Sequence, residues 1–246
     1  MDTDSGRGDF VLGAGDHAVE GATPVSGSQT LDRGLKLLEL LAAEDRDMTV
    51  AELAAALGMH RQAVYRLLTT LRSHRLAAEG SSGRYRLGLG VIQLARQANP
   101  HLRRAVLPHL RTLAEELGVT AQCVVAEGDD AVVLAVVEPS DAVFHLSQRS
   151  GARHALAQGA SGIAIMMSRD PQPRDSEAVL EARSRGYAVS RGTLTPGAVG
   201  IAVPLYASEG HAMDASLGIV SMIDLDVDRT ASRLIAAADQ ITATEL

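Results

Sequence analysis

Hydrophobic residues recur at helical spacing in three successive segments between residues 31 and 72. The first segment, residues 31–42, predicts a helix with one apolar stripe, which we expect to face a core. That stripe consists of Leu31, Leu35, Leu38, Leu41 and Ala42.

A short turn separates the second segment from the third. The second begins at a capping-box pattern, formed by Thr49 and Glu52, and Gly58 follows it where a helix often ends. Its apolar residues are Val50, Leu53, Ala54 and Leu57. The third begins near His60 and carries Val64, Leu67, Leu68 and Leu71. This spacing is typical of a helix-turn-helix.

The residues that follow predict a β-hairpin and a connecting helix. Residues 76–79 and 84–87 are two short extended segments on either side of a Gly/Ser turn at residues 80–83, which indicates a wing. A helix from Leu89 to Ala98 should follow, and Asn99-Pro100 marks a domain boundary.

The second half of the chain mixes helices and strands. Helices are expected at residues 102–117, 159–167, 177–185 and 231–241, and strands at residues 120–127, 131–138, 143–148, 199–206 and 215–222. Strands before and between helices indicate an α+β domain. We therefore expect a tail at residues 1–27, a winged helix-turn-helix at 28–88, a linker helix at 89–100 and an α+β domain at 101–246.

The amino-acid composition and the motifs that are missing exclude several kinds of site and protein. Residues 1–27 are rich in Gly, Asp and Ser without an apolar period, which indicates a disordered tail or an added tag. Cys123 is the one cysteine, so neither a disulfide within the chain nor a cysteine-based zinc site is expected. The sequence shows no signal peptide or stretch long enough to cross a bilayer, so we expect a cytoplasmic protein. No motif points to a cofactor, a metal or a catalytic residue set.

The distribution of charge favours a polyanionic partner, although the net charge of the whole chain is −7. Residues 60–86 hold six arginines and one acid, Glu79. A local basic footprint decides nucleic-acid binding more than the global sum does.

The third helix carries polar side chains opposite its apolar side. Arg can contact guanine and Gln can contact adenine in the major groove, and both Arg and Tyr can reach phosphates. The alternative is an ordinary solvated helix face. With the wing and the start of the second helix, the candidate DNA contacts are Thr49, Arg61, Gln62, Tyr65, Arg66, Thr69, Arg72, Arg84 and Arg86.

Several segments together resemble the IclR family of bacterial transcriptional regulators. They are residues 29–35 (QTLDRGL), 54–59 (AAALGM), 64–68 (VYRLL), 85–88 (YRLG), 186–187, 196–204 and 217–221. The resemblance implies a winged helix-turn-helix, a linker helix and a GAF-like effector domain with an antiparallel sheet. It also implies homodimers or dimers of dimers on palindromic double-stranded operators, and a small organic effector.

The resemblance also implies the place of an effector pocket. By it, the pocket residues would be Gly159, Ala160, Ser161, Ser190, Gly200, Gly218 and Val220. Positions that are commonly polar in the family are occupied here by Gly200, Gly218 and Val220, so the pattern predicts a neutral or mostly apolar effector. The start of the recognition helix also departs from the family, with Gln62 and Ala63 in place of small hydroxyl residues.

The leading interpretation is a sequence-specific regulator, acting as a repressor, whose operator binding is modulated by an effector. The reduced polarity of the pocket keeps open an effector-independent regulator with a decayed sensor. An enzyme built on the C-terminal domain is the third class, and no catalytic constellation supports it.

Overall fold

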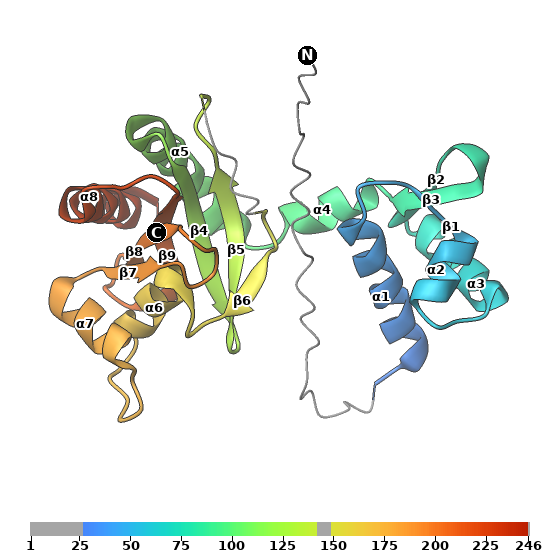
Figure 1. The fold of residues 1–246 in the computed structure, drawn as a ribbon, viewed down its shortest axis with the longest axis horizontal. Coiled ribbons are helices and arrows are strands. Elements are labelled where there is room, and N and C mark those ends of the chain that lie inside the picture. The colour runs from blue at the N-terminus through green and yellow to red at the C-terminus, as the bar shows by residue number, and fades with distance from the viewer. Residues whose placement is uncertain (1–26, 142–148, 246) are drawn as a thin grey trace, which may run out of the picture. The chain divides into compact units, whose positions relative to one another are not determined.

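The computed structural model describes residues 27–141 and 149–245, which belong to two compact units that part between Ala95 and Arg96. Figure 1 shows the helices and strands of each unit. Two predictions fall outside the described residues: the tail, except for Gly27, and the strand at residues 143–148.

The first unit combines three helices with a small antiparallel sheet in the order β1-β3-β2. Its elements are α1 (Gln29–Ala43), β1 (Met48–Thr49), α2 (Val50–Ala56), α3 (Arg61–Ser73), β2 (Ala77–Glu79), a 3-10 turn (Ser81–Gly83) and β3 (Arg84–Leu87). The helix α4 (Gly90–Arg96) follows. The predicted helix-turn-helix and wing are thus both formed, and β1 adds a third strand that the hydrophobic pattern did not predict.

The buried face of α1 differs from the predicted stripe. Gly34, Leu37 and Leu41 are buried, whereas Leu31 is 62% exposed and Leu35 is 50% exposed. Ala42 is exposed as well, and Leu38 is only partly buried. Leucines lie on adjacent faces of this helix, and packing against α3 and β3 selects one of them. The helix was predicted correctly, and the assignment of its core-facing side was wrong.

The second unit is a six-stranded antiparallel sheet with helices on both faces. Its strand order is β6-β5-β4-β9-β8-β7. The elements are α5 (Pro100–Leu117), β4 (Thr120–Glu127), β5 (Asp130–Val137), β6 (Arg153–Ala155), α6 (Gly159–Ser168), α7 (Glu177–Arg185), β7 (Ala188–Arg191), β8 (Val199–Tyr206), β9 (Ala212–Ser221) and α8 (Val227–Glu245).

The two faces of this sheet carry different side chains because strand residues alternate in direction. Ile201, Val203 and Leu217 belong to the main core with residues of α5 and α8, which lie together on one side in Figure 1. Ala202 packs with residues of α6 and α7 on the other face. A close contact also fixes the start of α6: a Cβ at Gly162 would lie 1.9 Å from the carbonyl oxygen of Leu156, in the turn between β6 and α6.

Several element boundaries differ from the sequence prediction, and two short strands were missed. The predicted helix over 89–98 is shorter, because α4 ends at Arg96 and Asn99 takes a left-handed conformation with φ of 47°. The following helix begins at Pro100 instead of Leu102. The strands β6 and β7 were missed, since three or four residues are too few for an alternating pattern to be recognised.

Candidate DNA-binding surface and effector cavity

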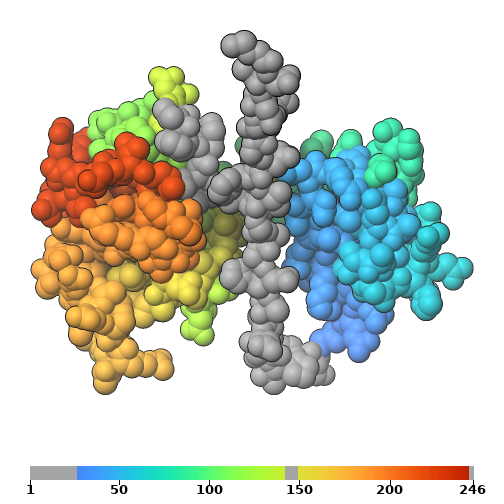
Figure 2. All heavy atoms as spheres, viewed as in Figure 1, coloured from blue at the N-terminus to red at the C-terminus, as the bar shows by residue number. Residues whose placement is uncertain are grey.

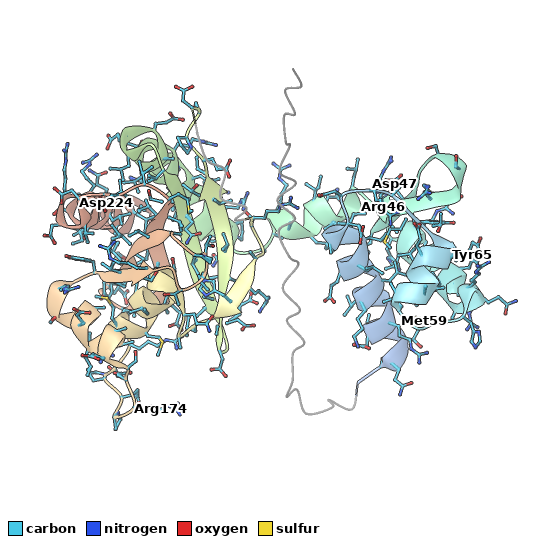
Figure 3. The ribbon with its side chains drawn as sticks, in the orientation of Figure 1. Arg46, Asp47, Met59, Tyr65, Arg174 and Asp224 are labelled. Carbon is cyan, nitrogen blue, oxygen red and sulfur yellow. The ribbon has the colours of Figure 1, made fainter. Side chains whose placement is uncertain are left out.

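The helix α3 presents the predicted polar residues on its uncovered side. Val64 and Leu68 are almost fully buried and anchor the helix on the core of the first unit. Tyr65 is 52% exposed, and its ring extends from α3 away from the body of the unit (Figure 3). The space-filling view shows α3, in cyan, at the surface of this unit (Figure 2). The other exposed candidates on this helix are Arg61, Gln62, Arg66, Thr69 and Arg72.

These side chains differ in whether they already have partners. Thr69 donates a hydrogen bond from Oγ1 to the carbonyl oxygen of Tyr65 at 2.9 Å. Arg72 forms an ion pair at 2.7 Å with Glu79, which lies on the wing strand β2. Within the described part of the chain, no ion pair or side-chain hydrogen bond holds Arg61, Gln62 or Arg66. Those three are therefore the groups most available to a nucleic acid.

A capping box fixes the start of α2 and hence the turn that leads to α3. The Thr49 hydroxyl accepts a hydrogen bond from the Glu52 amide at 3.2 Å, and the Thr49 amide donates to Glu52 Oε2 at 2.7 Å. The bond from the Thr49 amide, followed by those that the Thr49 hydroxyl and Arg46 donate to the same carboxylate, lowers the pKa of the Glu52 carboxyl to about 2. Thr49 was a candidate DNA contact, and in the structure its hydroxyl stabilises the helix terminus.

The wing arginines are held by acidic partners that lie far away in the sequence. Arg84 Nη1 donates to the carbonyl oxygen of Asp47 at 3.1 Å and approaches Glu52 Oε2 at 3.5 Å. Arg86 Nη1 lies 3.4 Å from Asp47 Oδ2. Asp47, labelled in Figure 3, thus lies beside the wing. Half-exposed ion pairs of this kind are weak, so a phosphate group can replace the carboxylate.

A small cavity lies in the second unit, where the N-terminus of α6 meets the sheet. Its volume is about 30 Å³. The residues proposed from the family resemblance divide into two groups. Ala160, Ser161, Ser190, Gly200 and Val220 line the cavity. Gly159 and Gly218 are not among its lining residues.

Strand register brings the lining residues together. Ser190 is paired with Gly200 and Gly200 with Val220, so the three form one row across β7, β8 and β9. The Ser190 hydroxyl also accepts a hydrogen bond from the amide of Ala160 at 3.0 Å, which joins β7 to the start of α6. A Cβ at Gly200 would lie 2.9 Å from Ser190 Oγ and 3.4 Å from the Cβ of Ala160. A side chain at Gly200 would therefore crowd Ser190 and enter the cavity that Gly200 lines.

The two remaining glycines serve close packing. A Cβ at Gly218 would lie 2.9 Å from the backbone oxygen of Ile201 and 3.0 Å from the Cβ of Ala202. Gly159 has a φ of 74°, and its Cβ would lie 2.7 Å from Cδ1 of Leu194. A larger residue at either position would strain the backbone or displace a neighbour before it filled the cavity.

Sequence reasoning missed several lining residues, of which Gln122 is the most buried polar one. Its side chain is 4% exposed, and Nε2 donates to Ser161 Oγ at 3.1 Å. The residue lies on β4, opposite Gly218 of β9. Only that pairing could have indicated its place. His154, Thr193, Leu194, Thr195, Ala198 and Ile219 complete the lining.

Cys123 and the possible metal ligands of the described residues were the other candidates for chemical function. Burial raises the pKa of the Cys123 thiol to about 12, so it stays protonated inside the core. No group of three or more His, Cys, Asp or Glu residues in residues 27–141 and 149–245 is placed to hold a metal ion. Over the same ranges, none of the helices has the length and apolar character needed to span a membrane.

Comparison with known proteins connects both units to regulators. A family model described as the IclR helix-turn-helix domain matches residues 30–80. The chain is 28% identical to the HTH-type transcriptional regulator BhcR of Paracoccus denitrificans over 254 residues, covering 90% of this chain and 89% of that protein. It is 32% identical to the transcriptional repressor IclR of Escherichia coli over 116 residues, covering 46% of this chain and 42% of that protein.

A solved structure shares the fold. The crystal structure of an IclR homologue from Microbacterium hydrocarbonoxydans, complexed with 4-hydroxybenzoate, matches with a TM-score of 0.73 and 22% identity. The match covers 87% of this chain and 98% of that one. With an IclR helix-turn-helix domain at residues 30–80 and a transcriptional regulator similar to it over nearly its whole length, the chain is a DNA-binding transcriptional regulator of the IclR helix-turn-helix type.

Proposed function

We propose that this regulator binds a palindromic operator as a homodimer or a dimer of dimers, and that a small organic effector in the α6 cavity changes its affinity for DNA. The observation that carries the proposal is the row of exposed, unpaired Arg61, Gln62 and Arg66 on α3. The first unit would bind DNA, α4 would serve as the linker, and the second unit would bind the effector. We place its action in the cytoplasm, and we propose repression because the Escherichia coli relative is a repressor.

Two sets of side chains are expected to contact different parts of the DNA. The N-terminal residues of a recognition helix reach the base edges, which assigns base recognition to Arg61, Gln62 and Tyr65. The wing arginines and Arg72 carry flexible charged groups that are balanced by nearby carboxylates, which suits them to phosphates. The helix would supply specificity, and the wing would supply affinity that depends on salt.

Exposed apolar residues of the first unit support a dimer. Leu31 and Leu35 lie uncovered on α1, and Leu89, Ile92 and Leu94 are exposed at and beside α4. Leu89 is 81% exposed, and with Ile92 and Leu94 it places three uncovered large apolar side chains close together in the sequence. Clustered exposed apolar residues mark protein interfaces. A second copy of this chain would bury them and double the number of recognition helices.

The cavity supports a neutral effector. It is lined by hydroxyl, amide and apolar groups, and His154 is its one lining residue that can carry a positive charge. The IclR homologue that was crystallised with 4-hydroxybenzoate shows that a protein of this fold can hold an aromatic ligand. That ligand is a carboxylate, whereas no arginine or lysine among the described residues lines the cavity of this chain. The small volume of the cavity in this chain favours, as a second candidate, a regulator that binds DNA without an effector.

The proposal predicts a specific footprint. Purified protein should protect a palindrome in the DNA upstream of its own gene, with half-sites about one helical turn or a multiple of a turn apart. DNase footprinting and sedimentation of the complex would measure the spacing and the number of chains. A monomer that shows no preference over random DNA of the same length would contradict the proposal.

The wing is expected to contribute equally to the affinity for every DNA sequence. Arg86→Ala should weaken binding to operator and random DNA equally and reduce the slope of log affinity against log salt by about one unit. Arg86 is a cleaner test than Arg84, because Arg84 also contacts the capping box. Arg185→Ala is the matched control, since Arg185 forms a comparable exposed ion pair with Glu181 in the other unit. A change in base preference with Arg86→Ala would reverse the assignment of roles.

A further inference from the structure

Gln122 has one end of its side-chain amide satisfied and the other end unsatisfied. Nε2 donates to Ser161 Oγ, whereas Oε1 is buried without a hydrogen-bond partner in the described residues. Buried polar groups in folded proteins nearly always have a partner, and a missing one carries a desolvation penalty. Because Gln122 lines the cavity, a molecule bound there is the natural partner for Oε1.

The backbone donor at the start of α6 is not free to hold an anion. The amide of Ala160, in the first turn of α6, is the kind of donor that holds a carboxylate at a helix N-terminus. Here it donates to Ser190 Oγ at 3.0 Å, so it is already satisfied within the protein. A carboxylate oxygen beside Gln122 would bring two hydrogen-bond acceptors together without a proton between them. Gln122 Oε1 therefore requires a hydrogen-bond donor from the ligand.

We propose, as a refinement that rests on the effector site proposed above, that Gln122 selects a neutral organic effector with a hydroxyl or amide N–H donor. Oε1 of Gln122 accepts the hydrogen bond from the ligand, while Nε2 donates to Ser161 Oγ. The Ser190 hydroxyl, which accepts from Ala160, keeps its own proton to donate to the ligand. An alcohol or a phenol meets both requirements, because its oxygen both donates and accepts.

Leu194 controls how large this ligand can be. A cavity of about 150 Å³ holds benzene, whereas this cavity measures about 30 Å³. Leu194 lines it and packs against Gly159, and its segment lies between Gly192 and Gly197, whose φ values are 65° and 79°. Displacing this side chain gives the readiest access for a larger ligand. Truncating it in Leu194→Ala should make room for a ring without altering Gln122.

The test uses three probes of similar size that differ in one group: 4-fluorophenol, 4-fluorotoluene and 4-fluorobenzoate. Their affinities for the full chain carrying Leu194→Ala would be measured by fluorine NMR titration at neutral pH. The phenol, which has a neutral donor, should bind about tenfold more tightly than the toluene or the benzoate. In wild type the same order should hold, with weaker binding of all three probes.

The variant Gln122→Met in the Leu194→Ala background removes the acceptor at nearly constant side-chain length. It should reduce the preference for the phenol over the toluene to less than about twofold, because nothing then accepts the phenol proton. Gln172→Met, an exposed glutamine of the same unit, is the matched control and should leave the preference unchanged. Melting temperatures of both variants report whether the unit remains folded.

Other outcomes separate the failure of this inference from the failure of the effector site. Tighter binding of the benzoate, or an equal loss of all three probes in Gln122→Met, would show that Gln122 does not select for a donor. Gly200→Ala places a methyl group beside Ser190 in the cavity and should abolish phenol binding. Unchanged phenol binding in that variant would place the probe elsewhere, so both the effector site and the inference would be wrong.

Discussion

Replacing Arg61 or Gln62 by alanine is expected to weaken operator binding by about 1–3 kcal/mol for each residue, which is roughly 5- to 150-fold. Both side chains are exposed at the start of α3, and neither is held by an ion pair or side-chain hydrogen bond from the described residues. A bidentate contact to a base edge is lost entirely on truncation to alanine, so the effect should be largest on the base pair that each residue contacts.

The measurement is the affinity of each variant for a set of operators that carry every base at each position of one half-site. The variants should lose discrimination at one or two positions and keep it elsewhere. Thr70→Ala is the control, because Thr70 is exposed on the same helix and its hydroxyl is bonded to the carbonyl oxygen of Arg66. A uniform loss on all operators and on random DNA would mean that these residues contact phosphates instead of bases.

Gly162→Ala is expected to destabilise the second unit by about 1–3 kcal/mol, although alanine is the better helix former. The new Cβ would lie 1.9 Å from the carbonyl oxygen of Leu156 and 2.8 Å from its carbonyl carbon. These are backbone atoms that cannot rotate away, so either the start of α6 or the turn at Leu156 must move. Since α6 forms one wall of the cavity, the same change should alter ligand binding.

Gly34→Ala is the matched control for this prediction, and we expect the opposite sign. Gly34 also lies within a helix, but the nearest atom to its new Cβ would be Leu67 Cδ2 at 3.9 Å. Without a clash, the gain in helix propensity should stabilise the first unit by about 0.5–1 kcal/mol. Calorimetric unfolding would resolve the transition of each unit. Equal stabilisation by the two substitutions would show that the turn at Leu156 does not restrict α6.

Local patterns were sufficient to predict the helix-turn-helix. The capping box of Thr49 and Glu52, the turn at Gly58 and the apolar spacing of Val64 and Leu68 each depend on residues within about one or two helical turns of one another. Such interactions are encoded by neighbours in sequence, so a single chain reveals them. The exposed side of α3 follows from the same periodicity, which is why the candidate base-contacting residues could be named in advance.

Contacts between distant segments were not predictable in this way. The core-facing side of α1 depends on where α3 and β3 pack, and the leucines of α1 permit more than one answer. The pairing of Arg86 with Asp47 joins residues on β3 and ahead of β1, and β1 itself is too short to leave a pattern. These features depend on how helices and strands that are distant in the sequence pack against one another.

The cavity shows the same division. The family resemblance in the sequence indicated that Ser190, Gly200 and residues 159–161 would lie at an effector pocket, although the strand β7 itself was not predicted. Only the tertiary structure decided that Gly200 lines the cavity whereas Gly218 packs against the Ile201 carbonyl, because the difference lies in the atoms opposite each glycine. It also placed Gln122 in the cavity, because the pairing of β4 with β9 joins segments nearly a hundred residues apart. Spacing along a chain encodes local periodicity, whereas strand order and helix packing decide which side chains meet.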